Sequence, residues 1–284
     1  MQTMQVRKQP EQLSGNRYRF GRDGEYEITI ARTLEDRKRA WTMVYRSYLE
    51  KGYAKPDQDK LWYGMYDALP QTTTFIVTKD GNDLATVTTV FDSEVGLPAD
   101  QLYQDELDIL RMKGRRLCEV ISLACEETDR RRGIDVLKHL FKVGLHMACK
   151  LVDATDFVIT VNPHHASYYE KKLLFRRQGV ERSYGKVNGA PAVLLILDLV
   201  TLSNAYMEHY GPMEGSIWHH FFEPKALSNT VWFLAESIAF DGRAELIHWF
   251  EVKKPEVLAA LRQAHRPFDA IYELGTADGL ACGE

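Results

Sequence analysis

The sequence predicts an α/β (α+β) fold: a mixed, mostly antiparallel sheet with a central parallel strand pair, flanked by helices and followed by a helical appendage. Two apolar runs, residues 118–125 and 157–161, are typical of strands and enclose an amphipathic helical segment, which makes them parallel neighbours. Two further pairs of β-rich runs are joined by short turn sequences, as in antiparallel hairpins. From Asn204 onwards the chain becomes aromatic and proline-broken, which indicates the appendage.

A polar arm and a short strand precede the first helix. Residues 1–24 are polar and rich in Gln, Arg and Gly, so we expect a flexible N-terminal arm. Residues 26–31 alternate in polarity, as a half-buried strand does. Thr33 is a suitable N-cap, with Asp36 at the capping-box position, for a helix that ends near Gly52.

The remaining strands and helices follow one another along the chain. The helical segment after Gly133 carries apolar residues at helical spacing, which predicts a core-facing stripe. The stretch 157–161 is almost wholly apolar, as expected for a strand buried on both faces. In chain order we expect a hairpin at 73–91, a helix at 100–112, a strand at 118–125, the helix after Gly133, a strand at 157–161, a hairpin at 179–199, and helices at 221–240 and 244–263.

A basic turn lies where the central strand meets the next helix. The strand at 118–125 is followed by Arg130, Arg131, Arg132 and Gly133, and the amphipathic helix begins there. The first N–H groups of a helix have no partners within it, and the helix dipole adds partial positive charge. The turn therefore predicts an anion site, and the order of parts indicates transfer of a group carried on a phosphate-bearing cofactor.

Composition narrows the class of protein. Of the 284 residues 45% are hydrophobic and 27% charged, which is ordinary for a globular domain, and the net charge of −4 gives no reason to expect a nucleic-acid partner. No segment is long and apolar enough to span a bilayer. The four cysteines form no CxxC pair, so we expect free thiols and a reducing, cytoplasmic setting. The histidine pairs at 164–165 and 219–220 match no zinc spacing, so no metal site is expected.

Basic residues gather in short clusters around the same part of the chain. Clusters of this kind are often a solvated surface, but together beside one anion site they favour a docking face for an acidic partner. The clusters are Arg115-Arg116, Arg130 to Arg132, Lys171-Lys172 and Arg176-Arg177.

The order of elements resembles the GCN5-related N-acetyltransferase (GNAT) superfamily. The cofactor signature of that superfamily is Gln/Arg-x-x-Gly-x-Gly/Ala, at the start of the helix after the fourth strand. Arg130 and Gly133 match it, and Asp135 replaces the last Gly or Ala. The resemblance implies that the segment Arg130, Arg131, Arg132, Gly133 and Ile134 binds the donor. A carboxylate at position 135 would repel a pyrophosphate, which favours the single phosphodiester of a phosphopantetheine arm on an acyl carrier protein over acetyl-CoA.

A second GNAT signature consists of an Asn after the fifth strand and a later Tyr-x-(Lys/Arg)-…-Gly-Phe helix. Asn162, Tyr169, Lys171 and Phe175 match it, and Leu174 replaces the Gly. The segments VYRSYLEKGY (44–53) and CEVISLAC (118–125) resemble the FeeM-type N-acyl amino acid synthases. These are GNAT-fold relatives of the acyl-homoserine-lactone synthases, and they join a long acyl chain from acyl carrier protein to the α-amine of an amino acid.

The resemblance covers roughly residues 26–200, and it divides the chain into three parts. We expect a flexible arm at 1–24, a GNAT-like acyltransferase domain at 25–204 and a helical C-terminal appendage at 205–284. Three roles stay open for the appendage: it could cap an acyl tunnel, form a homodimer or bind the carrier protein.

Forming an amide from a thioester requires a deprotonated amine, a stabilised oxyanion and a leaving thiolate. Glu119 is the candidate general base or amine-orienting residue, because burial would raise its pKa into a useful range. The structural alternative is a salt bridge to Arg46, Arg115 or Arg116. The resemblance implies that a backbone N–H near Leu123 holds the oxyanion and that Tyr169 protonates or steadies the leaving sulfur.

Other residues are candidates for substrate binding. Arg46 and Tyr53 lie in the segment that resembles the synthases, and we expect them at the amino-acid carboxylate and a substrate lid. Ser122 could add a hydrogen bond, and Asn162 could bind the pantetheine amides or simply form a strand-end turn. The aromatic run at 62–66 could line an acyl or aryl pocket or pack in the core.

The sequence therefore predicts an N-acyltransferase that moves a long-chain acyl group from acyl carrier protein, or from acyl-CoA, to the α-amine of an amino acid. No permanently bound cofactor is expected, since the acyl-phosphopantetheine is a co-substrate. Three alternatives remain: an acyl-homoserine-lactone synthase that uses S-adenosylmethionine, an ordinary acetyltransferase that uses acetyl-CoA, and a catalytically inactive GNAT-fold binding module, which the departures at Asp135 and Leu174 keep open.

Overall fold

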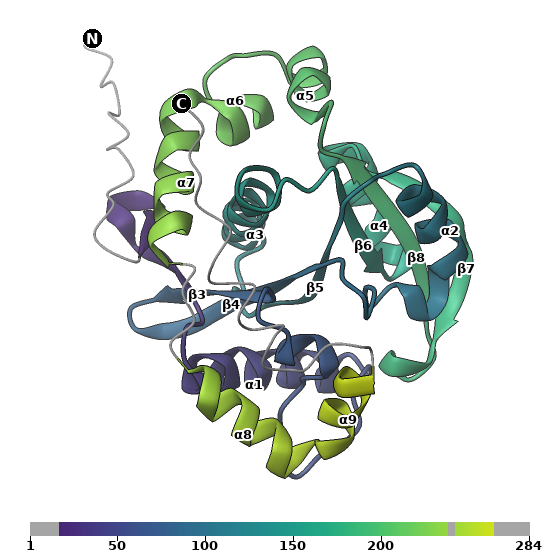
Figure 1. Cartoon of the computed structure of the whole chain (residues 1–284). Helices are drawn as coiled ribbons and strands as arrows, with labels where there is room; N and C mark the ends of the chain where they lie inside the picture. Colours follow the sequence, from purple (N-terminus) through teal and green to yellow (C-terminus); the bar gives the residue numbers. More distant parts are fainter. Residues whose placement is uncertain (1–16, 238–241, 264–284) are drawn as a thin grey trace.

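An eight-stranded sheet forms the centre of the computed structural model, which describes residues 17–237 and 242–263 (Figure 1). The strands lie in the order β1-β2-β3-β4-β5-β6-β8-β7, and every neighbouring pair is antiparallel except β5 and β6. The sheet is therefore the predicted mixed, mostly antiparallel one. The strands are β1 (Tyr18–Phe20), β2 (Tyr26–Ile30), β3 (Thr73–Lys79), β4 (Asn82–Phe91), β5 (Leu117–Cys125), β6 (Asp156–Val161), β7 (Arg176–Tyr184) and β8 (Ala190–Asp198).

The parallel pair separates before its strands end. Glu119 is paired with Val158, and the last paired residues are Val120 and Ile159. β5 nevertheless continues to Cys125. The second half of β5 thus has no β6 neighbour, and this opens a gap in the middle of the sheet.

A bulge in β5 lies beside this gap. On the β4 side, Thr88 pairs with Ile121 and Thr86 pairs with Ala124, so Ser122 and Leu123 stand opposite a single residue of β4. Ser122 has a φ of 54°, in the left-handed region that residues other than Gly rarely adopt. The bulge turns the β5 backbone where the two parallel strands part.

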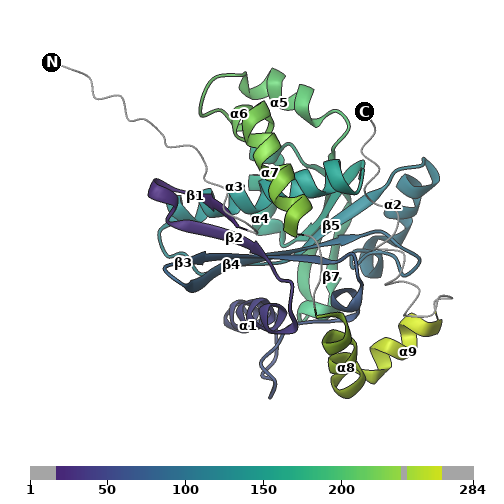
Figure 2. The ribbon, with the colours of Figure 1, turned by 60° about the vertical axis from the view of Figure 1, so that its left-hand side comes forward.

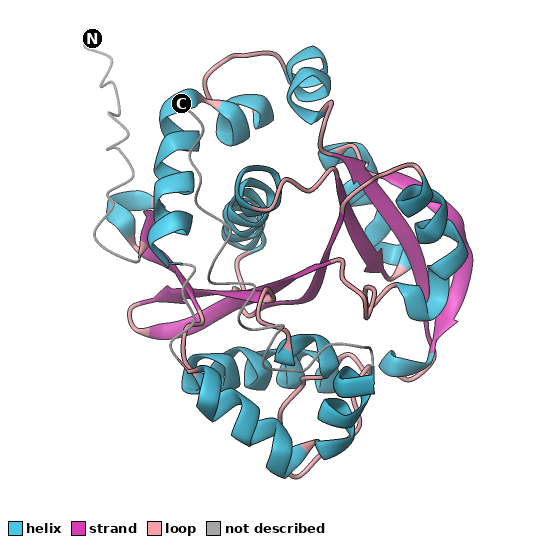
Figure 3. Ribbon diagram, viewed as in Figure 1, coloured by secondary structure: helices cyan, strands magenta, loops and turns pink. Residues whose placement is uncertain are grey.

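Helices cover both faces of the sheet (Figure 3). The side chains of β5 alternate between two cores: Val120 and Leu123 belong to the core under α3, whereas Ile121 belongs to the core that includes α2. The helices are α1 (Leu34–Glu50), α2 (Asp100–Met112), α3 (Arg130–His146), α4 (Pro163–Leu173), α5 (Leu202–Tyr210), α6 (Ile217–Phe222), α7 (Pro224–Ser237), α8 (Arg243–Lys253) and α9 (Pro255–Gln263), with short turns η1 (Arg22–Gly24), η2 (Met65–Ala68), η3 (Met147–Leu151) and η4 (Gly185–Val187).

The C-terminal helices contact both faces (Figure 2). On the α3 side, Tyr206 and Phe233 are fully buried, and the Tyr206 hydroxyl donates a hydrogen bond to the Leu173 carbonyl at 2.9 Å. On the α1 side, the ring of Phe250 in α8 packs edge-on against Tyr63, with 5.5 Å between ring centres. The helical character expected for 205–284 holds through residue 263 outside the gap at 238–241, and these helices are continuous with the core rather than separate from it.

Several expected boundaries differ from the structure. Part of the expected flexible arm is ordered, because β1 pairs Tyr18 with Ile28 of β2; residues 1–16 lie outside the described range.

The capping box of Thr33 and Asp36 is present as predicted. Proline divides the expected C-terminal helices, since Pro224 and Pro255 each begin a new helix.

Cys118, Cys125 and Cys149 are free thiols, as predicted, and Cys282 lies outside the described residues. Among the residues that the structure describes, we find no helix with the length and hydropathy needed to cross a membrane.

Candidate active site

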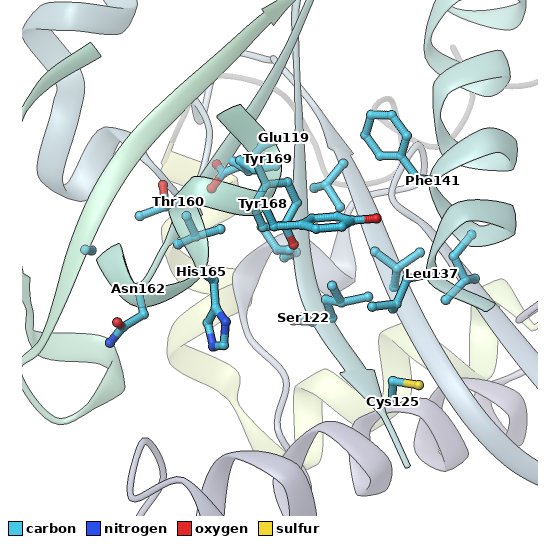
Figure 4. Close-up of a pocket in the computed structure, with 18 of the residues that line it drawn as sticks. Glu119, Ser122, Cys125, Leu137, Phe141, Thr160, Asn162, His165, Tyr168 and Tyr169 are labelled. Carbon is cyan, nitrogen blue, oxygen red and sulfur yellow. The ribbon is translucent and has the colours of Figure 1, made fainter. Parts of the chain in front are cut away.

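A cavity of about 500 Å³ passes through the gap between β5 and β6. Its walls come from both sides of the sheet, because it is lined by Glu119 on the α2 side and by Leu137 and Phe141 on the α3 side. The close-up in Figure 4 shows Glu119, Ser122 and Cys125 in succession along β5, with side chains of α3 and α4 around them. We call the two halves of this cavity the carboxylate limb and the apolar limb.

The carboxylate limb is aromatic and contains one deeply buried acid. Glu119 is only 2% exposed, and aromatic side chains line the limb beside it. The Trp62 ring lies 4.9 Å from that of Tyr48, which itself lies 5.8 Å from Tyr53, both measured between ring centres. The limb is formed by Tyr48, Tyr53, Trp62, Glu119, Thr160, Tyr184 and Lys186.

Glu119 accepts a hydrogen bond on Oε2 from the backbone N–H of Ala99, at 2.7 Å. Burial raises its pKa from 4.5 to about 8, against the opposing effects of the Ala99 N–H and of the positive charge on Lys186. The carboxyl group therefore exchanges a proton close to neutral pH, as a general base must.

The alternative that Glu119 is held in a salt bridge is wrong. Arg115 pairs with Asp156 and Asp198, and Arg116 pairs with Asp153. Arg46 pairs with Glu126 at 3.0 Å. None of the three candidate arginines reaches Glu119, whose carboxylate is left facing the cavity and the Ala99 amide.

The apolar limb lies between the sheet and α3. Gly144 is the one glycine among the described residues that line the cavity. A Cβ at this position would meet Thr89 Cγ2 at 3.5 Å and Phe157 Cζ at 3.6 Å, so an added methyl group would make ordinary contacts with both residues. This limb is defined by the uncharged residues Val87, Thr89, Leu137, Leu140, Phe141, Gly144, Phe157 and Ile159, and Lys138 of α3 also lines the cavity.

The bulge lies between the two limbs. Ser122 and Leu123 both line the cavity, and β6 has no residue paired with β5 beyond Val120. The backbone of the bulge thus faces the gap without a strand partner on that side. Backbone N–H groups in this position are suited to an oxyanion that develops in the gap.

Helix α4 contributes tyrosines to the opposite wall. Figure 4 shows Tyr168 and Tyr169 reaching from α4 toward β5. Burial raises the pKa of Tyr169 to about 12, so the phenol keeps its proton at neutral pH. The ring of Tyr169 also packs edge-on against Phe175 at 5.7 Å, so this residue has both a packing role and a hydroxyl available to the cavity.

The mouth of the cavity lies near the starts of α3 and α4. Arg130, Ile134, Asn162 and His165 line it. Asn162 is the N-cap of α4, because its Oδ1 accepts a hydrogen bond from the His164 N–H at 3.0 Å. The cap leaves the amide NH2 of Asn162 available as a donor.

The start of α3 differs from the open anion cradle that we expected. The carboxylate of Asp129 accepts hydrogen bonds from the N–H groups of Arg131 and Arg132, at 3.0 and 2.9 Å. An internal cap therefore occupies two of the first-turn amides. Of the three arginines, Arg130 lines the cavity, and Arg131 and Arg132 are exposed beside it.

The model of one protein family covers most of the region that builds this site. The family described as "N-acyl amino acid synthase FeeM" matches residues 39–198, which include both limbs and the bulge. The chain belongs to the FeeM family. It is accordingly an acyltransferase of the N-acyl synthase kind.

The solved structure of FeeM agrees with the FeeM assignment. FeeM from uncultured soil microbes is 25% identical over 63% of this chain and 93% of its own, with a TM-score of 0.56. The AHL synthase LasI is 14% identical over 61% of this chain and 90% of its own, with a TM-score of 0.46. An acyl-CoA N-acyltransferase from Pseudomonas aeruginosa is 15% identical over 60% of this chain and 98% of its own, with a TM-score of 0.42. No curated protein matches the sequence.

Within this FeeM-family site, the structure separates the predicted residues into two groups. Arg46 does not line the cavity and is exposed with its Glu126 partner. Gly133 is buried against Glu127 at the start of α3. Of the aromatic run at 62–66, Trp62 lines the cavity, whereas Tyr63 and Tyr66 pack in the core. The predicted residues that line the cavity are Tyr53, Glu119, Ser122, Leu123, Arg130, Ile134, Asn162 and Tyr169.

Sequence reasoning missed several residues of the FeeM-family site. Tyr184 and Lys186 lie in the β7–β8 hairpin, and Thr160 lies on β6 on the Glu119 side. The hairpin was expected from its turn sequence, but nothing in that pattern indicated that it reaches the cavity. Only the pairing of β8 with β6 brings the hairpin there.

Proposed function

We propose that the protein transfers a long-chain acyl group from acyl carrier protein, or from acyl-CoA, to the α-amine of an amino acid. The observation that carries this proposal is the two-limbed cavity through the sheet. One limb is apolar and closed by a helix, which suits an alkyl chain, and the other holds a buried carboxylate among aromatic rings, which suits a small amine. The gap between them is where the thioester would lie.

The reaction is an aminolysis. The α-ammonium of the acceptor first loses a proton, and its nitrogen then attacks the thioester carbonyl carbon. The new C–N bond forms as the carbonyl oxygen becomes an oxyanion, and the attached nitrogen gives up its second proton. Collapse of this intermediate breaks the C–S bond as the sulfur takes up a proton. The products are an N-acyl amino acid and the free thiol of the phosphopantetheine arm.

Three groups of the cavity would perform these steps. Glu119, with its pKa near 8, takes the proton from the amine directly or through a water. A backbone N–H of the bulge at Leu123 stabilises the oxyanion. Tyr169 supplies a proton to the leaving sulfur, since its phenol remains protonated at neutral pH.

The donor would enter at the basic mouth. Arg130 lines the mouth and makes no ion pair with any residue that the structure describes, so its guanidinium is free to bind a phosphodiester. Arg131 and Arg132 stand exposed on the same turn. With two first-turn amides already capped by Asp129, the side chains rather than the helix backbone would bind the phosphate and the acidic surface of a carrier protein.

Mass spectrometry of reactions with defined substrates tests the proposal. The purified protein is incubated with acyl carrier protein loaded with a series of acyl chains, and with a mixture of amino acids. We expect N-acyl amino acids together with free carrier thiol. Parallel reactions replace the donor with acetyl-CoA or the acceptor with S-adenosylmethionine.

Each alternative predicts a different product. Acetylation from acetyl-CoA, without any preference for longer chains, would identify an ordinary acetyltransferase. A lactone from S-adenosylmethionine would identify a homoserine-lactone synthase. Absence of any acyl transfer by correctly folded protein, with every donor and acceptor tried, would contradict the proposed reaction.

A further inference from the structure

A lysine of the β7–β8 hairpin projects over the carboxylate limb. Lys186 lies in η4 and lines the cavity. Its Nζ is 6.0 Å from the centre of the Trp62 ring, and a Cβ added at Gly64 would lie 3.9 Å from it. The ammonium group is thus placed between the hairpin and the segment that carries Trp62.

The hairpin tip is tied to the end of the first helix. Asn188 Nδ2 donates a hydrogen bond to the Gly52 carbonyl at 3.3 Å, which joins the β7–β8 hairpin to the segment that follows α1. Asn188 itself adopts a left-handed φ of 57°, so the turn has a defined shape. Lys186 therefore stands on a fixed turn beside the entrance of the limb.

Lys186 Nζ makes no ion pair and no hydrogen bond with any residue that the structure describes. Neighbouring lysines differ, because Lys253 pairs with Asp59 at 2.8 Å and Lys254 donates to the Tyr63 carbonyl at 2.7 Å. The nearest acid that the cavity offers is Glu119, and the Lys186 charge lowers its pKa without any direct contact between the two. A cation and a buried carboxylate thus share one limb, separated by the space that the cavity provides.

We propose that Lys186 binds the carboxylate of the amine acceptor, while the amine of the same molecule faces Glu119. This inference rests on the proposed function and adds that the acceptor must be a small amino acid-like molecule with a free carboxylate. A zwitterion offers charges opposite to those of the limb, which Trp62 and Tyr184 also line. Arg46, which we expected in this role, is occupied by Glu126 on the exposed surface.

Steady-state kinetics of a Lys186→Gln variant test the proposal. The acceptors are the preferred amino acid and the amine that has the same side chain but lacks the carboxylate. With the amino acid we expect the acceptor KM to rise roughly 10- to 100-fold, as for loss of a charge-assisted hydrogen bond. With the decarboxylated amine, wild type and variant should have the same KM, and the donor KM should not change in either case.

Two further variants make the result specific. Lys186→Arg keeps a cation on the turn and should restore most of the lost acceptor binding. Lys113→Gln removes an exposed lysine at the end of α2 and should behave as wild type. Thermal melting of all three variants checks that the fold is intact.

Two outcomes would overturn the proposal while leaving the reaction established. The first is an unchanged amino-acid KM in Lys186→Gln. The second is an equal loss with the amino acid and with the decarboxylated amine, which would mean that Lys186 acts only through the charge of Glu119. If wild type forms no N-acyl amino acid, the proposed function fails first, and this is known before any variant is measured.

Discussion

The backbone N–H of Ala99 donates a hydrogen bond to Glu119 Oε2 at 2.7 Å, and this contact joins the start of α2 to the middle of the central strand. The same loop is fixed by Arg111, which pairs with Asp92 and Asp100, both at 2.7 Å. Glu119 therefore faces the cavity from a rigid support. A buried carboxylate that is held in position and has a pKa close to neutral pH is suited to act as the base in aminolysis.

The raised pKa of Glu119 predicts the pH dependence of turnover. If the carboxylate is the base, the rate should increase with pH and level off above about pH 8, the pKa of the group. Glu119→Gln cannot accept the proton, so we expect its turnover to fall roughly 100-fold or more. Turnover measured from pH 6 upward checks both statements.

The same pKa makes a prediction about stability. Folding raises the pKa of Glu119, so the native state holds a proton that the unfolded state has released between pH 4.5 and about 8. Its contribution to stability is present below pH 4.5 and is lost as pH rises through 8. In denaturant unfolding at a series of pH values, Glu119→Gln should lose less stability than wild type as the pH rises. An identical pH dependence of stability in the two proteins would contradict this prediction.

Gly144 is predicted to set the length of the acyl chain. An alanine Cβ would lie in ordinary contact with Thr89 and Phe157, so Gly144→Ala should fold and favour the helix by about 1 kcal/mol. Gly144→Leu would fill the apolar limb. We expect kcat/KM to fall roughly 4-fold for each methylene that no longer fits, from about 0.8 kcal/mol per group.

The measurement for Gly144 is a profile of kcat/KM against acyl chain length. Gly144→Leu should shift the optimum to shorter chains while transfer of the shortest chains is retained. An optimum that does not move, in a protein with native thermal stability, would place the acyl chain outside the apolar limb.

We expect activity to depend on the backbone conformation of the bulge at Ser122 and not on the serine hydroxyl. Ser122→Ala and Ser122→Gly should retain activity within about 2-fold, and Gly should relieve part of the left-handed backbone cost of about 1–2 kcal/mol. A β-branched residue is a marked outlier at a φ of 54°. Ser122→Val should therefore lower both melting temperature and turnover, and equal loss in Ser122→Ala would instead assign a role to the hydroxyl.

The buried His146 and the partly buried His220 predict acid sensitivity. Burial lowers the pKa of His146 and of His220 from 6.5 to about 3, and the nearby Lys142 opposes protonation of both. Lys150 beside His146, and Lys138 beside His220, add positive charge. His146 Nε2 donates a hydrogen bond to the Phe221 carbonyl at 2.7 Å, and this hydrogen bond joins the end of α3 to α6.

As the pH falls, these histidines take up protons in the unfolded state at a higher pH than in the native state. Their contribution to the stability of the native state is therefore complete above pH 6.5 and is lost as the pH falls toward 3. From pH 7 to 5.5 we expect a loss of roughly 2–3 kcal/mol in the free energy of unfolding. His220→Leu should remove about half of this dependence. Leucine at the exposed His209 is the control, and a pH slope unaffected by His220→Leu would contradict the assignment.

Local pattern was sufficient for most of the fold. The capping residues of α1, the turn sequences of the hairpins and the apolar runs of β5 and β6 each follow from interactions between residues close in sequence. Signature positions such as Arg130, Asn162 and Tyr169 were named through the resemblance to the GNAT superfamily, whose motifs are read along the chain. Glu119 was recognisable as a carboxylate within an apolar strand.

Local pattern failed where the outcome depends on distant partners. Arg46 carries the right charge for a carboxylate, but Glu126 is close enough in space to occupy it. Asp129 caps α3 and closes part of the cradle that the basic turn predicted. Lys186 lies far along the chain from Trp62 and Glu119, and no periodicity connects them.

By itself, the sequence determined the order of strands and helices from β2 to β8, the parallel central pair and the identity of the buried acid, since these depend on periodicity and on short-range caps and turns. Only the tertiary structure decided which charges are paired, where β5 and β6 part and which hairpin reaches the cavity. The physical reason is that ion pairing, burial and the pKa values that follow from burial are set by neighbours in space, and residues such as Gly52 and Asn188 become neighbours only when the sheet is complete.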